Sequence, residues 1–305
     1  MKKILLTVFA CMLCLAVFCG CQPKITVENA LEIYDLEMTK IDEAKAFGAD
    51  MQLSFAVNMA GIDINVQTDG KYQILVNEED VPEKLFMSFG DAENALYEIT
   101  YVDNMAYVSA AGTKYSMSYS EDEMKEYMME SIPEIPDETE EVYAVDSVEE
   151  LKEQKQTRLN ITMKSDVMVD IFRYLIDDTG ETGEKIFSDD VIRESVSMGE
   201  SIIFTEDNQL SSAQLKLDIT KAFFEEYFDS MYGELEEEMD VSQMLPSNMS
   251  VEINFTNITT TVDIQAPEDA DEYYSMDDAG GDIFGDDIFG DDIFGAVTDL
   301  PAVVA

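Results

Sequence analysis

Residues 51–76 have the sequence MQLSFAVNMAGIDINVQTDGKYQILV, in which apolar and polar side chains alternate. A period of two predicts β-strands with one apolar face and one polar face. Gly61 allows a turn inside this stretch, and Asp69-Gly70 is a strong signal for a second, two-residue turn. The stretch therefore predicts three consecutive antiparallel strands joined by tight turns.

The same alternation continues over four more segments towards residue 119. They are residues 85–89, 97–101, 105–107 and 115–119, with Asp103-Asn104 and Ala111-Gly112 as turns between the last three. The sequence thus predicts an antiparallel meander of about six or seven strands.

Helices are predicted on both sides of this meander, where apolar residues recur at steps of three and four. The first spans about residues 27–46 and ends near Gly48, a residue type that suits a helix end. Ser120 and Glu123 form a capping box that begins a short helix after the meander. In the second half we predict a loop at 132–146, a helical turn at 148–154, a strand at 159–163, a helix at 167–175, a hairpin at 202–219, a helix at 222–239 and a last strand or strand pair at 251–264.

The apolar face of such a sheet needs a cover, because exposed apolar surface is unfavourable in water. The helical stripes at residues 27–41 and 223–235 are the candidate covers. We therefore expect a single α+β domain over residues 27–272. It would be a curved antiparallel half-barrel with helices covering its concave face.

The composition excludes several kinds of function. The formal net charge is −48, and Asp and Glu number 66 against 18 Lys and Arg, so nucleic acid is not an expected partner. The sequence has no histidine, and its four cysteines all lie within the first 21 residues. We therefore expect no imidazole or thiol catalysis, no metal site and no cofactor. A hydrolase built on paired carboxylates is one enzyme alternative, but no acidic pair stands out in the sequence. A Ser-Lys dyad is another, but the chain after the signal peptide has no Ser-x-x-Lys motif.

The first 21 residues predict where the protein is located. Met1-Lys2-Lys3 is cationic, residues 4–18 are almost wholly apolar, and Gly20 precedes Cys21. This order is typical of a secretory signal peptide at residues 1–20, and the apolar run is too short to span a bilayer. Its end, Gly20-Cys21, resembles a bacterial lipobox, which implies a lipoprotein signal peptide. We expect Cys21 to carry the lipid (palmitate) and residues 21–26 to form a lipidated tether. The protein would then be exported and anchored to the outer face of the bacterial cytoplasmic membrane.

Phe18 leaves a second outcome open. The lipobox that precedes a lipidated cysteine usually has leucine at this position, three residues before Cys21. If Cys21 is not acylated, the protein is secreted instead of anchored.

Residues 273–305 differ in composition from the rest of the chain. They contain a repeated DDIFG pentad, whose period of five matches neither a strand nor a helix. We interpret them as an acidic low-complexity tail. Paired aspartates could bind calcium, but the EF-hand spacing is missing. The alternative is a solvated tail whose Ile-Phe dipeptides contact a partner protein.

Methionine and aromatic residues are abundant at the apolar positions of the predicted strands. Methionine adapts its shape to varied apolar ligands, so these positions could line a binding concavity. The alternative is that they pack the sheet against the helices. The candidate lining residues are Phe55, Met59, Met87, Tyr101, Tyr107, Met117 and Tyr119.

The order of a lipobox, a tethering helix, amphipathic strands, a helical insertion and terminal strands resembles the LolA/LppX-like bacterial lipoproteins. Residues 101–107 and 112–115 look like the turn-and-strand segments of clostridial-type, Gram-positive lipoproteins of this sort. The resemblance covers residues 27 to about 267. It implies a curved antiparallel sheet, closed on its concave side by helices, which holds a lipid or another apolar ligand. It brings no catalytic residues.

We therefore expect a non-catalytic, membrane-anchored lipoprotein that binds a lipid or another apolar molecule between sheet and helices. The alternative is a structural or interaction lipoprotein that engages another envelope protein through its acidic surface or tail.

Overall fold

The computed structural model describes residues 24–79, 81–91, 94–110, 112–130, 139–177, 187–232 and 245–276. The predicted signal peptide, Cys21 and the DDIFG repeats lie outside the described residues. Predictions about the lipid anchor and the repeats therefore stay predictions.

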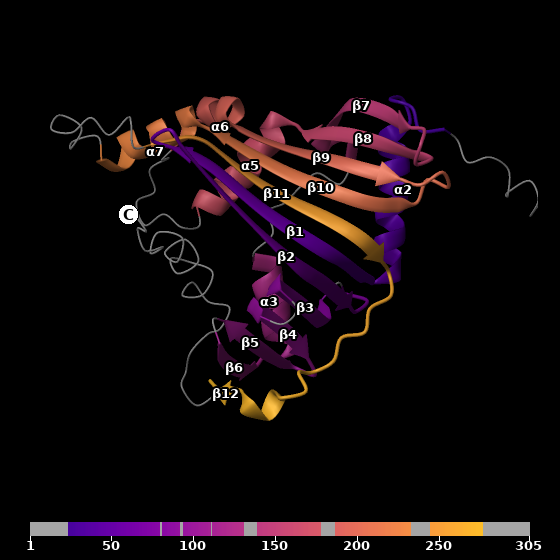
Figure 1. Cartoon of the computed structure of the whole chain (residues 1–305), viewed down its shortest axis with the longest axis vertical. Helices are drawn as coiled ribbons and strands as arrows, with labels where there is room; N and C mark the ends of the chain where they lie inside the picture. The colour runs from indigo at the N-terminus through magenta and orange to yellow at the C-terminus, as the bar shows by residue number, and fades with distance from the viewer. Residues whose placement is uncertain are drawn as a thin grey trace, which may run out of the picture.

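Twelve strands of the described chain form one large, curved and unclosed sheet (Figure 1). The strand order is β12-β6-β5-β4-β3-β2-β1-β11-β10-β9-β8-β7, and every pair except β12 and β6 is antiparallel. The strands are β1 (Ala46–Met59), β2 (Ile62–Val76), β3 (Pro82–Asp91), β4 (Asn94–Val102), β5 (Met105–Ala110), β6 (Thr113–Ser118), β7 (Tyr143–Leu151), β8 (Gln156–Met163), β9 (Val196–Phe204), β10 (Leu210–Thr220), β11 (Pro246–Thr259) and β12 (Tyr274–Ser275).

Two meanders meet in the middle of this sheet. Strands β1 to β6 run in sequence order towards one edge, which confirms the predicted meander. Strands β7 to β11 run in sequence order from the other edge, and β11 pairs with β1 along most of its length. The central strands therefore come from opposite ends of the chain.

The turn between β1 and β2 is the one predicted at Gly61. Ala60 and Gly61 both have positive φ angles, 53° and 78°, as the favoured two-residue hairpin turn requires. The predicted turn at Asp69-Gly70 is wrong, because β2 continues through these residues. Gly70 instead pairs with Met51 on one side and Phe89 on the other. The next predicted turn, Asp103-Asn104, is confirmed by φ angles of 53° and 63°.

The helices of the described chain are α2 (Ala30–Ala44), α3 (Glu121–Glu130), α4 (Thr139–Val142), α5 (Ser165–Asp177), α6 (Asp189–Ser195), α7 (Lys221–Tyr232) and the short 3₁₀ helix η2 (Ala270–Glu272). The predicted end of the first helix is wrong. Lys45, with φ of 53°, adopts the left-handed conformation that ends α2, and Gly48 lies inside β1. Helix α6 is not among the elements that the sequence predicts.

The prediction of a loop at 132–146 and a helical turn at 148–154 is wrong over residues 139–151. This part forms α4 and the edge strand β7. A bulge between Val145 and Ser147 interrupts the alternation of β7, which hides its period of two. The hairpin of β9 and β10 is confirmed. The strand or strand pair predicted at 251–264 is the single strand β11, which ends at Thr259, and the short strand β12 follows it in the chain.

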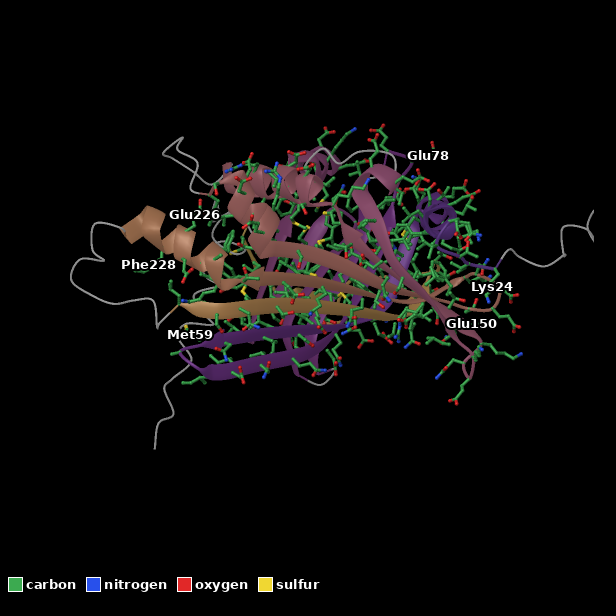
Figure 2. The ribbon with its side chains drawn as sticks, turned by 90° about the horizontal axis from the view of Figure 1, so that it is seen from above. Lys24, Met59, Glu78, Glu150, Glu226 and Phe228 are labelled. Atoms are coloured by element: carbon green, nitrogen blue, oxygen red, sulfur yellow. The ribbon has the colours of Figure 1, made fainter. Side chains whose placement is uncertain are left out.

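Three apolar clusters form where helices contact the apolar face of the sheet. Figure 2 shows α2, α5 and α6 on the same side of the central strands. The α2 cluster contains Ile25, Ala30, Ile33, Leu159, Ile161, Ile202 and Phe204. The α5–α7 cluster contains Val142, Met163, Val167, Met168, Val169, Phe187, Ile192, Val196 and Ile219, with Phe223 and Phe224 against it. The β3–β6 cluster contains Val81, Ile99, Tyr101, Ala106, Val108, Met117, Tyr119 and Met124 of α3.

Candidate functional site

The middle of the apolar face lies between these three clusters. The strand register places Leu53 opposite Ile253, and Phe55 opposite both Val251 and Val66. We call this surface the central apolar strip, which consists of Leu53, Phe55, Val57, Ile64, Val66, Val251 and Ile253.

The central apolar strip is only partly covered by the described chain. None of its side chains belongs to the three clusters. Most of them are half-buried, and Val66 is 48% exposed. Met59, at the hairpin end of β1, is 42% exposed. The strip is therefore apolar surface that the described part of the protein does not fully bury.

The structure divides the seven predicted lining residues among three places. Phe55 belongs to the central apolar strip, and Met59 lies on the same face at its end. Tyr101, Met117 and Tyr119 are buried in the β3–β6 cluster, with Met87 packed against them. Tyr107 lies on the opposite face, where its ring contacts that of Tyr273 at 5.3 Å between centroids.

The position of Tyr107 follows from the turn before it. A two-residue turn pairs Tyr101 with Ala106, so even-numbered residues of β5 share the face of odd-numbered residues of β4. Tyr107 pairs with Thr100 and Ser116, which places it among polar residues. Phe55 and Met59 thus remain as candidate lining residues at or beside the strip.

The carboxyl group of Glu200 lies beside the strip. The alternation of β9 places this side chain on the apolar face of the sheet. Glu200 of β9 alternates with Met198 and Ile202, and it pairs with Ile161 of β8 and Leu215 of β10. The hydroxyl of Tyr34 from α2 donates to Oε2 of Glu200 at 3.2 Å. The hydroxyl of Tyr143 from β7 donates to Oε1 at 2.6 Å. We call Tyr34, Tyr143 and Glu200 the Glu200 cluster.

The surroundings of the Glu200 cluster change the acidity of its members. Burial raises the pKa of Glu200 above that of an ordinary glutamate, and the hydrogen bonds from Tyr143 and Tyr34 oppose this rise. Burial and the Glu200 carboxylate together raise the pKa of Tyr34 and of Tyr143. Both hydroxyls therefore keep their protons at neutral pH and act as donors.

The Glu200 cluster is not among the sites that the sequence predicts, although a signal for it exists. The hairpin is predicted from Ile202 and Phe204. Extending the same alternation back through Met198 and Val196 places Glu200 on the apolar face. A carboxylate at such a position needs a partner inside the protein.

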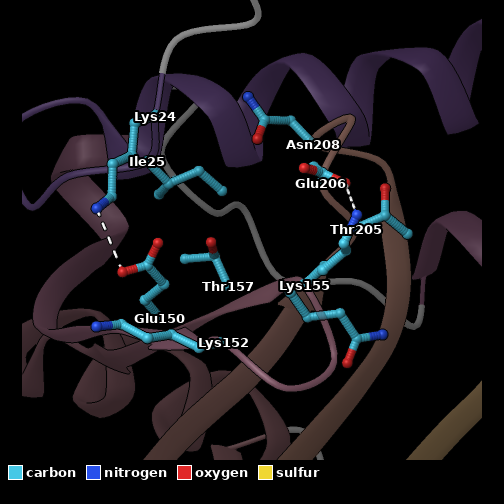
Figure 3. A pocket seen from close by; sticks show the side chains of 10 residues that line it. Lys24, Ile25, Glu150, Lys152, Lys155, Thr157, Thr205, Glu206 and Asn208 are labelled. Atoms are coloured by element: carbon cyan, nitrogen blue, oxygen red, sulfur yellow. Dashed lines mark hydrogen bonds and ion pairs between the residues drawn. The ribbon is translucent and has the colours of Figure 1, made fainter.

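A polar pocket of about 310 Å³ lies beside the start of α2 (Figure 3). Lys24 and Glu150 approach each other across it at 3.5 Å, and Lys155 approaches Glu206 at 3.4 Å. A second concavity, of about 440 Å³, lies over Asn160, Ser201 and Gln214 on the polar face of the sheet. Their polar linings suit an apolar ligand less well than the central apolar strip does.

Clusters of metal ligands and membrane-spanning helices are both absent from the described residues. Nowhere in residues 24–276, apart from the gaps given above, do three or more His, Cys, Asp or Glu side chains gather to hold a metal ion. Within the same residues, no helix is both long enough and apolar enough to cross a membrane.

No family model matches this chain, and no curated protein matches it by sequence. Among solved structures it is similar to the lipoprotein LppX from Mycobacterium tuberculosis, with 8% identity and a TM-score of 0.37 over 79% of this chain and 100% of that one. It is also similar to LprF from Mycobacterium bovis, with 9% identity and a TM-score of 0.36 over 79% and 97% of the two chains. A LolA superfamily protein from Nitrosomonas europaea has 7% identity and a TM-score of 0.24 over 80% and 96%.

These structures include an LppX lipoprotein and a LolA superfamily protein, the two types named in the resemblance given above. At such TM-scores, however, neither family membership nor a ligand carries over to this chain. The finer resemblance to clostridial-type, Gram-positive lipoproteins stays a prediction.

Proposed function

We propose that this protein is an extracytoplasmic, non-catalytic lipoprotein that binds a lipid or another apolar molecule on the central apolar strip. The ligand would lie between the sheet and the helices on its concave side. The observation that supports this most directly is the strip itself. Its side chains lie between three clusters of buried residues and are only half-buried or exposed.

The energetics of burial favour an occupant for the strip. Covering apolar surface contributes about 25 cal/mol for each Å² removed from water. Contiguous exposed apolar surface on a soluble protein commonly marks a binding site. The strip lies across β2, β1 and β11, whose backbones are hydrogen-bonded to neighbours on both sides, so it forms a firm platform.

A lipid anchor at Cys21 would bring one end of the domain closer to the membrane than the other. Ile25 is buried in the α2 cluster and follows the predicted lipidation site Cys21 by four residues. An extended chain of this length spans about 14 Å at most. Lys24 and Met59 lie at opposite ends of the central strands in Figure 2. We infer that the Lys24 end faces the membrane and the Met59 end points away from it.

Binding of Nile red, an uncharged apolar probe, tests the proposed function. We expect saturable fluorescence enhancement with the purified protein. The variant Phe55→Gln, which places an amide in the strip, should weaken probe binding by about tenfold. The matched control Ser54→Gln introduces the same side chain on the opposite face of β1 and should leave binding unchanged.

Circular dichroism of both variants confirms that they are folded before binding is compared. No saturable probe binding to the unsubstituted protein would contradict the proposal. Equal binding by the two variants would show that the probe binds somewhere other than the strip.

A further inference from the structure

Glu200 is unusual among the residues that share its face of the sheet. The inward positions of β8 to β11 and β1 are otherwise occupied by uncharged residues along the described chain. Placing a carboxylate among apolar side chains is unfavourable unless other groups compensate its charge. The described residues provide two neutral tyrosine hydroxyls, and no ion pair is formed there with Lys or Arg. The charge of Glu200 is thus solvated by hydrogen bonds but not neutralised.

The Glu200 carboxylate also has acceptor capacity left. Each carboxylate oxygen can accept about two hydrogen bonds. Tyr34 occupies one acceptor position on Oε2 and Tyr143 one on Oε1. The Glu200 residue is half-buried, so it is not sealed from solvent. A ligand donor could therefore reach the carboxylate without displacing either tyrosine.

The strand register connects Glu200 directly to the central apolar strip. Glu200 pairs with Leu215, Leu215 pairs with Ile253, and Ile253 pairs with Leu53. Neighbouring strands are about 4.8 Å apart, so this row extends about 14 Å from the carboxylate across apolar side chains. A molecule with one polar end and a hydrocarbon chain matches the row in both chemistry and direction.

The charge of the ligand's polar end decides which class of ligand suits the Glu200 carboxylate best. An ammonium group would neutralise Glu200 and donate to its free acceptor positions. An anionic head would be repelled by Glu200 and by a chain with a net charge of −48. We infer that the ligand is a cationic amphiphile, whose amine binds Glu200 and whose hydrocarbon chain lies over Leu215, Ile253 and Leu53. This inference rests on the proposed function, because it specifies the ligand class of the same strip.

Competition against bound Nile red tests the inference. The competitors are dodecylamine, which is protonated at neutral pH as lysine is, together with dodecanol and dodecanoate. They share one chain length and differ in the charge of the head. With the unsubstituted protein we expect dodecylamine to compete about tenfold more strongly than dodecanol, and dodecanoate to compete least.

Two variants separate a specific contact from general attraction. Glu200→Gln should bring dodecylamine to within about twofold of dodecanol and leave Nile red binding intact. The control Glu252→Gln removes the same charge from β11, next to β10, on the polar face that also carries Lys216. It should keep the preference for the amine. A third variant, Tyr143→Phe, retains the carboxylate and removes one donor, so it should keep the preference as well.

The outcomes are distinguishable. Equal competition by dodecylamine and dodecanol in the unsubstituted protein overturns the inference and leaves the proposed function standing. Equal loss of the preference in Glu252→Gln and Glu200→Gln also overturns it, because attraction would then come from net charge alone. The same holds if Tyr143→Phe, with its carboxylate intact, shows no preference for the amine. Absence of Nile red binding overturns the proposed function and the inference together.

Discussion

At Gly70, strand β2 lies close to the backbone of β3. A Cβ atom at this position would lie 2.3 Å from the carbonyl oxygen of Ser88, far inside van der Waals contact. The obstacle is backbone in the middle of a sheet, so it cannot rotate away. Glycine is therefore the residue that the local strand spacing requires.

Gly70→Ala is expected to destabilise the protein by about 1–3 kcal/mol, the usual range for overpacking. Gly199→Ala is the matched control, because Gly199 also lies inside a strand but a Cβ atom there would have its nearest contact at 3.5 Å. This control should change the free energy of unfolding by less than about 1 kcal/mol. Urea unfolding of both variants measures the difference, and equal values would show that β2 and β3 can move apart at no cost.

Gly70 and Tyr107 show why residue type alone does not predict the place of a single residue in the sheet. Asp69-Gly70 has the composition of a hairpin turn, but its role depends on Ser88, which belongs to another strand. Tyr107 has the right residue type for an apolar lining, but the turn before it reverses its face. Residue type alone decides neither outcome, because Gly70 depends on the neighbouring strand and Tyr107 on the number of residues in the turn before β5.

Helix α3 is an element whose beginning is set by local contacts. The backbone N–H of Ser120 donates to Oε2 of Glu123 at 2.7 Å, and the N–H of Glu123 donates back to Oγ of Ser120 at 3.2 Å. This capping box fixes the first turn of the helix. Met124, on the same turn, is buried in the β3–β6 cluster. The cap therefore also positions the contact between helix and sheet.

Ser120→Ala removes the hydroxyl and is expected to lower the free energy of unfolding by about 1 kcal/mol. Ser120→Thr keeps a hydroxyl at the same position and should cost much less. Tyrosine fluorescence during urea unfolding reports the change, since the chain has 14 tyrosines and no tryptophan. A threonine variant as unstable as the alanine variant would mean that the hydroxyl is not the stabilising group.

Elements defined by local signals are predictable from the sequence, and those defined by packing are not. The capping box of α3 and the hairpin of β9 and β10 each rest on residues close in sequence, and both are confirmed. Strand β7 escapes prediction because its bulge breaks the alternation. The Glu200 cluster joins α2, β7 and β9, so its assembly depends on three elements far apart in the chain.

For the molecule as a whole, self-repulsion opposes folding. The net charge of −48 is spread over 305 residues, and folding brings these charges closer together. Dissolved salt screens such repulsion over a Debye length of about 30 Å at 0.01 M and about 3 Å at 1 M. The melting temperature should therefore rise as NaCl is increased between these limits.

KCl at equal ionic strength is the control for this rise. Screening depends on ionic strength, so the two salts should give the same increase in melting temperature. A rise with one salt and not the other would indicate specific ion binding. A melting temperature that does not change with either salt would show that the acidic residues do not oppose folding.

The pairing of β1 with β11 also determines the stage of folding at which the central apolar strip forms. Met51 and Phe255 are opposite each other in the sheet but about 200 residues apart in the chain. Contacts of such long range form slowly, because a long loop must close before they gain any stabilisation. Each meander can form from neighbouring strands, whereas the strip spans the junction between them. The site is therefore completed only after β11 has been synthesised, and a chain truncated before Pro246 would keep the β1 and β2 part of the strip but lack Val251 and Ile253.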